Sequence, residues 1–121
     1  MKKSGLGIHL IADYYGCDFE RVNSPEFLEE TLLEAVSVAG ATLVQSVVHQ
    51  FSPQGITAVA VVEESHFSIH TWPEFGYVAV DVFTCGNCSG ELAEEVFHRK
   101  LKAKSKEIQW IHRGQLAQEN L

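Results

Sequence analysis

The chain has 121 residues, of which 45% are hydrophobic and 21% are charged, and this composition is typical of a single domain spanning residues 1–121. Its formal net charge of −7 disfavours nucleic acid as a partner, because a phosphate backbone attracts basic surfaces. The sequence has neither an apolar signal core nor the roughly 18 apolar residues that a transmembrane helix needs, so we expect a cytoplasmic protein with no membrane partner. Its three cysteines, an odd number, indicate free thiols.

The first half of the chain predicts a strand, a helix and two more strands. Residues 6–14 have an extended character, and the strand predicted there precedes a clear helix start. Ser24 can cap that helix, Pro25 suits its first turn, and apolar residues then recur at helical spacing up to Gly40, a natural stop. Residues 42–51 and 56–63 are rich in Val, Ile and Thr and are separated by Pro and Gly, which indicates two strands.

The second half predicts two strands, a helix and a last short strand. Strand-type sequence covers residues 67–72 and 77–84, a helical pattern covers 89–103, and 108–111 could add a final strand. Because hairpin-length connections separate most strands, we expect an antiparallel sheet with two helices on one face, an α+β fold in the form of a two-layer sandwich. The second face of that sheet then has no helix, so we expect a dimer partner or a ligand there, unless the face is merely polar.

Residues 63–74 carry the densest group of hydroxyl, imidazole and carboxylate side chains. In an extended chain His66, Ser68 and His70 share one face, whereas Phe67 and Ile69 point to the other. The two imidazoles are then about 13 Å apart along a strand, which is too far for one metal ion. We therefore predict no metal site, and we expect the chemistry of the protein to take place near this segment.

Two further segments can be interpreted in more than one way. Cys85 and Cys88 form a Cys-x-x-Cys pair, a spacing found in thioredoxin-like redox proteins and in half of a zinc site, although an inert core thiol is the default interpretation. The redox motif normally leads into the helix of a βαβ unit, and a zinc site needs a second pair, whereas only Cys17 remains. Residues 49–57 predict a strand followed by a turn, in which a lone His49 is more often structural than catalytic.

Taken together, these segments resemble the prokaryotic S-adenosylmethionine decarboxylase proenzymes over most of the chain. The resemblance begins near the N-terminus, and its most specific part lies between residues 64 and 86. The matching motifs are Gly7-Ile8-His9-Leu10, Tyr15-Gly16-Cys17-Asp18, Glu64-Ser65-His66-x-x-Ile69-His70, Trp72-Pro73-Glu74-x-Gly76-Tyr77 and Asp81-x-x-Thr84-Cys85-Gly86. Their order and spacing make the chain similar to this family rather than to a protein that shares one short motif.

The resemblance implies a self-processing enzyme that makes its own cofactor. The hydroxyl of Ser65 would attack the carbonyl of Glu64, and cleavage between them would leave a β chain of residues 1–64 and an α chain of residues 65–121. Ser65 would thereby become a pyruvoyl group, the electron sink that decarboxylation of an amino acid needs. By the same resemblance His70 accepts a proton during processing, and Thr57, which stands where the family commonly has a serine, helps to stabilise the processing intermediate.

The resemblance also implies the reaction and the residues that bind the substrate. The substrate amine would form a Schiff base with the pyruvoyl group, and after loss of CO2 Cys85 would donate a proton to the α-carbon. Phe51 and Trp72 match the aromatic residues that hold the adenine and the sulfonium, and Glu74 matches the carboxylate that holds the ribose hydroxyls. The product, decarboxylated S-adenosylmethionine, serves spermidine synthesis, and the family implies a homodimer of cleaved protomers whose sites draw on both copies.

Three positions depart from the family pattern and leave alternatives open. Ile8 stands where an arginine is usual, Gln50 where a basic residue is common, and Thr57 where a serine is common. Losing positive groups could change how the substrate carboxylate is held, so a pyruvoyl-dependent arginine or ornithine decarboxylase on the same fold is the alternative enzyme. A binding subunit that no longer cleaves and a thiol redox protein are the alternatives from other classes.

Overall fold

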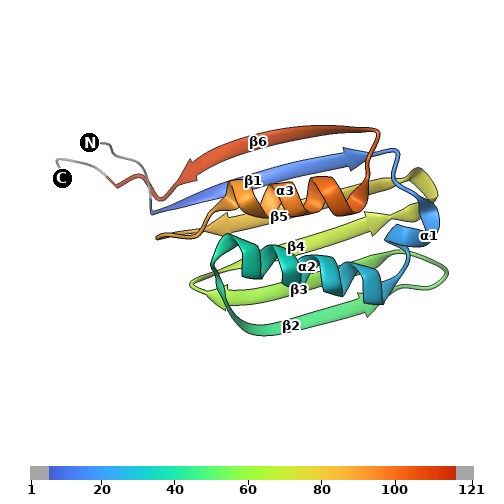
Figure 1. Ribbon diagram of the computed structural model, residues 1–121, viewed down its shortest axis with the longest axis horizontal. Helices are drawn as coiled ribbons and strands as arrows, with labels where there is room; N and C mark the ends of the chain where they lie inside the picture. Colours follow the sequence, from blue (N-terminus) through green and yellow to red (C-terminus); the bar gives the residue numbers. More distant parts are fainter. Residues whose placement is uncertain (1–5, 117–121) are drawn as a thin grey trace.

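A computed structural model of the protein describes residues 6–116, in which six antiparallel strands form one sheet (Figure 1). Two long helices, α2 (Pro25–Ala39) and α3 (Gly90–Leu101), lie side by side across one face of this sheet (Figure 1). From one edge to the other the strand order is β2-β3-β4-β5-β1-β6. In chain order the strands are β1 (Gly7–Tyr15), β2 (Thr42–Gln50), β3 (Ile56–Glu63), β4 (Ser65–Trp72), β5 (Tyr77–Thr84) and β6 (Ser105–Arg113). The predicted two-layer α+β architecture is confirmed.

Differences from the prediction are confined to short elements and to the ends of longer ones. The one-turn helix α1 (Phe19–Val22) and the 3-10 turn η1 (Pro73–Phe75) were not predicted, because elements this short show no periodicity. Strand β4 begins two residues earlier than expected, at Ser65, which pairs with Val62 immediately after the turn. Strand β6 is longer than the predicted 108–111 because its backbone pairs along the whole of β1, whatever the polarity of its side chains.

Helix α2 begins and ends where its sequence predicts. The hydroxyl of Ser24 accepts a hydrogen bond from the Phe27 amide at 3.1 Å, which satisfies one of the free N–H groups of the first turn. Gly40 ends the helix with φ at +84°, a left-handed conformation that glycine adopts without steric cost. Although α2 has 15 residues, no helix of residues 6–116 is long and apolar enough to cross a membrane.

The hydrophobic core lies between the helices and one face of the sheet. Side chains alternate along each strand, so β1 buries Leu10, Ala12 and Tyr14 and turns the residues between them to the opposite face. The largest fully buried side chains are Tyr14, Phe67, Phe97, Leu10, Leu28, Leu32, Ile56, Ile69, Leu101, Val22, Val78 and Val80. Both long helices lie on the core side, which leaves the other face of the described sheet without a helix (Figure 1). We call this second face the open face.

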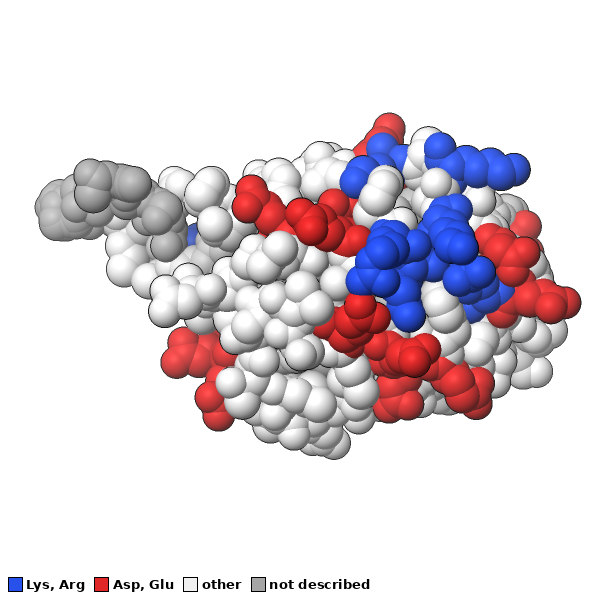
Figure 2. All heavy atoms as spheres, in the orientation of Figure 1, with Lys and Arg blue, Asp and Glu red and all other residues white. Residues whose placement is uncertain are grey.

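The surface over the two helices is mixed in charge. Figure 2 shows basic side chains gathered toward one end of this surface, with acidic side chains on both sides of them. Arg99 and Lys100 both lie within ion-pair distance of Glu34, at 2.6 and 3.6 Å, and Lys106 contacts Glu94 at 2.8 Å. These basic residues of α3 and β6 are thus partly neutralised by acidic neighbours.

Candidate active site

The turn between β3 and β4 carries the serine that the motif analysis singled out. Val62 and Ser65 are paired across the two strands, so Glu63 and Glu64 form the turn itself. The Ser65 hydroxyl is buried and has no hydrogen-bond partner among the described residues. An unpaired buried hydroxyl costs about 1–3 kcal/mol of stability, so most such groups in proteins are paired. Here the hydroxyl is left available for chemistry, next to the carbonyl of Glu64.

Cys85 lies beside this turn, one residue beyond the end of β5. Its thiol donates to the carbonyl oxygen of Glu64 at 3.7 Å and to the Glu64 carboxylate oxygen Oε1 at 3.5 Å. Burial raises the pKa of Cys85, and the hydrogen bond to Glu64 and its negative charge raise this pKa further. The thiol therefore carries its proton at neutral pH. Glu64, Ser65 and Cys85 together form what we call the turn site.

The turn site adjoins two connected hollows. The smaller, about 120 Å³, contains Cys85 and is otherwise lined by Leu6, Gly7, Ile8, Thr84, Gly86 and Cys88. A larger hollow of about 420 Å³ shares Ile8, Thr84 and Cys88 with it and extends toward Trp110 and His112 of β6. None of the residues predicted to bind a substrate lines the larger hollow. Only the smaller hollow includes Cys85, and it leaves open space beside this residue.

A second group of predicted residues meets at the opposite end of β4. A cleft of about 330 Å³ is lined by Phe51, Gln54, Gly55, Ile56, Thr57, His70, Thr71, Trp72 and Glu74. Thr57 and His70 face each other on β3 and β4, and the Thr57 hydroxyl lies 3.1 Å from Nδ1 of His70. The predicted residues Phe51, Thr57, His70, Trp72 and Glu74 therefore share one cleft, which we call the cleft site.

The aromatic side chains of the cleft site are half-exposed. Phe51 is 49% exposed and meets the ring of His49 edge-on, with the ring centroids 4.5 Å apart. Trp72 is 42% exposed, and the centroid of its ring lies 5.3 Å from the ring centroid of Tyr77. Rings held from one side in this way offer their free faces to a flat or cationic ligand. Neither His49 nor Tyr77 was predicted to support a site.

Within one chain the structure keeps the turn site and the cleft site apart. Ser65 and His70 are five residues apart on β4, which corresponds to about 16 Å along a strand. An odd separation also turns their side chains to opposite faces of the sheet. His70 therefore cannot reach Ser65 of the same chain, although the sequence places both in one motif.

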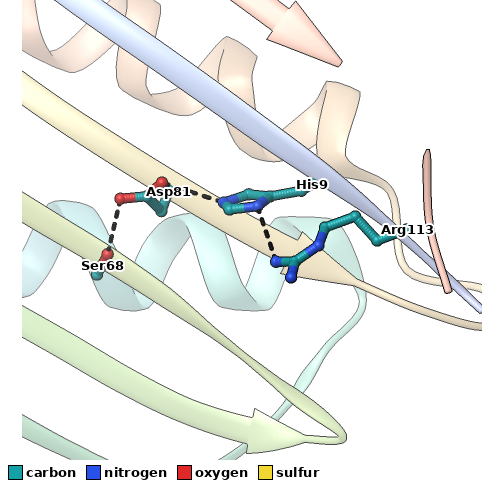
Figure 3. Close-up of polar contacts among 4 residues, drawn as sticks. All are labelled: His9, Ser68, Asp81 and Arg113. Carbon is teal, nitrogen blue, oxygen red and sulfur yellow. Dashed lines mark hydrogen bonds and ion pairs between the residues drawn. The ribbon is translucent and has the colours of Figure 1, made fainter. Parts of the chain in front are cut away.

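The open face carries a polar network to which the sequence analysis assigned no role (Figure 3). Nε2 of His9 lies 3.0 Å from one carboxylate oxygen of Asp81, and the Ser68 hydroxyl donates to the other at 3.5 Å. The guanidinium of Arg113 lies 3.4 Å from Nδ1 of His9 and can only donate, so Nδ1 accepts and Nε2 carries the proton. Side chains alternate between the two faces along β1 and β5, and this alternation places His9 and Asp81 on the open face. The same alternation was the signal in the sequence that could have predicted the network.

Comparison with known proteins identifies the family to which the chain belongs. The family model described as S-adenosylmethionine decarboxylase matches residues 8–114, nearly the whole described chain. The chain belongs to the S-adenosylmethionine decarboxylase family. The resemblance stated from the motifs is thus confirmed, and the matched range includes both the turn site and the cleft site.

Individual relatives of this S-adenosylmethionine decarboxylase family member are named as proenzymes. The S-adenosylmethionine decarboxylase proenzyme of Geobacillus sp. (strain WCH70) is 39% identical over 109 residues, which cover 90% of this chain and 88% of the relative. The proenzyme of Caldicellulosiruptor saccharolyticus is 54% identical over 81 residues, 67% of this chain and 65% of the relative. The crystal structure of the adenosylmethionine decarboxylase from Aquifex aeolicus is 38% identical, with a TM-score of 0.87, and the match covers 94% of this chain and 95% of that one.

The cysteines of this family member are free thiols, as the odd number predicted. Cys17 is buried, which raises its pKa to about 11. Cys85 and Cys88 are partly exposed and do not form a disulfide with each other. Helix α3 begins only after Ser89, whose hydroxyl accepts a hydrogen bond from the Leu92 amide at 3.1 Å.

Proposed function

We propose that this chain is a self-processing proenzyme that converts S-adenosylmethionine into decarboxylated S-adenosylmethionine and CO2, with a pyruvoyl cofactor made from Ser65. Membership of the S-adenosylmethionine decarboxylase family supports the reaction and its place in spermidine synthesis. The observation that carries the self-processing step is the buried, unpaired hydroxyl of Ser65 next to the Glu64 carbonyl. The proposal therefore includes cleavage of one domain into residues 1–64 and residues 65–121.

The residues of the turn site suit the first step of processing. The Ser65 oxygen attacks the carbonyl carbon of Glu64, and the peptide C–N bond breaks. The hydroxyl proton passes to the released nitrogen, which leaves an ester and a free amine on residue 65. Negative charge grows on the Glu64 carbonyl oxygen during this attack, and the Cys85 thiol already lies 3.7 Å from that oxygen. A donor in this position stabilises the charge as it develops.

The second step needs a base. Removal of the α-proton of residue 65 breaks the bond from its β-carbon to oxygen and releases Glu64 with a free carboxylate. Hydrolysis of the remaining dehydroalanine then releases ammonia and leaves the pyruvoyl group at the start of the α chain. We assign the proton removal to His70, because an imidazole is a suitable base near neutral pH. The Thr57 hydroxyl, 3.1 Å from Nδ1, orients its ring.

Residues of both the turn site and the cleft site take part in the decarboxylation. The pyruvoyl group supplies the electron sink for loss of CO2. Cys85, protonated because burial and Glu64 raise its pKa, donates the proton that the substrate α-carbon needs afterwards. Phe51 and Trp72 of the cleft site stack on the adenine and attract the sulfonium, and Glu74 accepts hydrogen bonds from the ribose hydroxyls.

A homodimer would bring the two sites together. The open face exposes apolar side chains, including those of Val47, Val61 and Ile111, and two sheets packed face to face lie about 10 Å apart. A two-fold axis that lies between the sheets and runs perpendicular to the strands reverses the strand direction. The Ser65 end of one β4 then lies over the His70 end of the other. We therefore propose that each active site joins the turn site of one copy with the cleft site of its partner.

The substrate is tested by CO2 release from three carboxyl-labelled compounds. The purified, cleaved protein should act on S-adenosylmethionine and not on arginine or ornithine. Glu74→Gln should raise KM for S-adenosylmethionine about tenfold, because a hydrogen bond to a charged group contributes about 1.5–3 kcal/mol. Glu63→Gln, which changes an exposed carboxylate outside the cleft site, is the matched control. Release of CO2 from arginine or ornithine instead would favour the alternative decarboxylase on the same fold.

A further inference from the structure

The thiol of Cys85 has two oxygen acceptors, and both belong to Glu64. One is the main-chain carbonyl oxygen at 3.7 Å, and the other is the carboxylate oxygen Oε1 at 3.5 Å. We propose that Glu64 is a positioning residue for the proton donor Cys85. The Glu64 carboxylate keeps the proton on the Cys85 thiol and directs this thiol toward the reacting carbon. This inference rests on the proposed decarboxylation and gives Glu64 a role that continues after the chain is cleaved.

Cleavage itself would strengthen the arrangement. In the intact chain the main-chain acceptor is a neutral carbonyl group. Cleavage between Glu64 and Ser65 converts this group into a terminal carboxylate, so the Cys85 thiol then faces two carboxylates of the same residue. A thiolate beside anions is unfavourable, and the processed enzyme should therefore hold the Cys85 proton more strongly than the proenzyme does.

The other groups around the thiol leave Glu64 as its main charged neighbour. Apart from Cys85 itself, the hollow beside the thiol is lined by Leu6, Gly7, Ile8, Thr84, Gly86 and Cys88. Of these lining residues only Cys88 is ionisable, and its negative charge acts like that of Glu64 and raises the pKa of Cys85. The described lining of this hollow contains no lysine or arginine to offset the Glu64 carboxylate.

A fixed proton donor matters for the lifetime of the enzyme. After loss of CO2 the proton must reach the α-carbon of the substrate. Protonation of the carbon that belongs to the pyruvoyl group would transaminate the cofactor and stop the enzyme. A thiol held at one point by the Glu64 carboxylate favours the productive position, so Glu64 should limit this inactivation.

Glu64→Gln tests the proposal because it keeps the size of the side chain and removes its charge. The variant should still cleave, since the attacked carbonyl belongs to the main chain. The alkaline limb of its kcat profile should move to lower pH, because a thiol without a neighbouring carboxylate ionises more easily. Inactivation during turnover should rise several-fold. Glu63→Gln, in the same turn, should leave both measurements unchanged, and Glu64→Asp should restore them in part.

A second readout does not depend on activity. The rate at which iodoacetamide alkylates Cys85, followed against pH by peptide mass spectrometry in a Cys88→Ser background, reports the ionisation of this thiol. Alkylation should start at the lowest pH in uncleaved Ser65→Ala/Glu64→Gln protein, at a higher pH in uncleaved Ser65→Ala protein, and at the highest pH in the processed enzyme.

The outcomes separate this inference from the proposed function. An alkylation profile that is the same with and without the Glu64 carboxylate would overturn the role of Glu64, even if the enzyme cleaves and releases CO2. Failure of the unmodified protein to cleave would overturn the proposed function. The comparison of Ser65→Ala with Ser65→Ala/Glu64→Gln would then still show whether Glu64 holds the Cys85 proton.

Discussion

A randomly paired mixture of two inactive variants, Ser65→Ala and His70→Ala, is expected to recover about a quarter of the wild-type decarboxylase activity. Each variant alone lacks one residue in both of its active sites. In a mixed dimer, Ser65 of the His70→Ala copy meets His70 of the Ser65→Ala copy and forms one complete site, whereas the other site lacks both. Random pairing makes about half of the dimers mixed, and each of these has one of its two sites intact.

The physical reason lies in the length of β4. Ser65 and His70 are about 16 Å apart along β4 within one chain, so a single copy cannot join them. Co-expression with two different affinity tags, followed by purification on both, isolates the mixed dimers. Intact mass should then show cleavage of the His70→Ala chain only. An isolated mixed dimer that neither cleaves nor releases CO2 would refute the shared site.

Cys85→Ala is expected to lower the rate of CO2 release per cleaved chain by about 10²–10⁴-fold, the usual contribution of one positioned proton donor. Cleavage should also slow, because the variant loses the thiol contact to the Glu64 carbonyl, so the rate is expressed per chain that carries the pyruvoyl group. The measurement combines intact mass with labelled CO2 release.

Cys88→Ala is the matched control for this substitution, because Cys88 lines the same hollow and makes no contact with Glu64 among the described hydrogen bonds. It should retain most of the activity. Equal losses in both variants would contradict the assignment of Cys85 as the proton donor, and they would favour the alternative in which the Cys-x-x-Cys pair performs thiol chemistry.

The sheet and the long helices could be predicted because their local signals agree with the tertiary fold. Ser24, Pro25 and Gly40 mark the limits of α2 through caps and backbone geometry, which depend on near neighbours alone. Strand β6 was predicted too short because its end residues, such as Ser105 and Arg113, are polar. Their place in the sheet depends on pairing with β1, about a hundred residues earlier in the chain.

The residues of the candidate site could be predicted from motifs, but their arrangement in space could not. The motif places Ser65 and His70 close together in sequence, whereas the strand holds them apart. The contact between Glu64 and Cys85 joins residues 21 positions apart, and it depends on where β5 ends relative to the β3–β4 turn. Only the folded sheet brings these two side chains together.

The intact mass of the purified protein under denaturing conditions tests self-processing most directly, beside a Ser65→Ala control. Two fragments that correspond to residues 1–64 and a pyruvoyl-capped chain ending at residue 121, absent from the control, are the predicted result. A single uncleaved chain of 13.5 kDa in the unmodified protein would contradict the conversion of Ser65 into the cofactor.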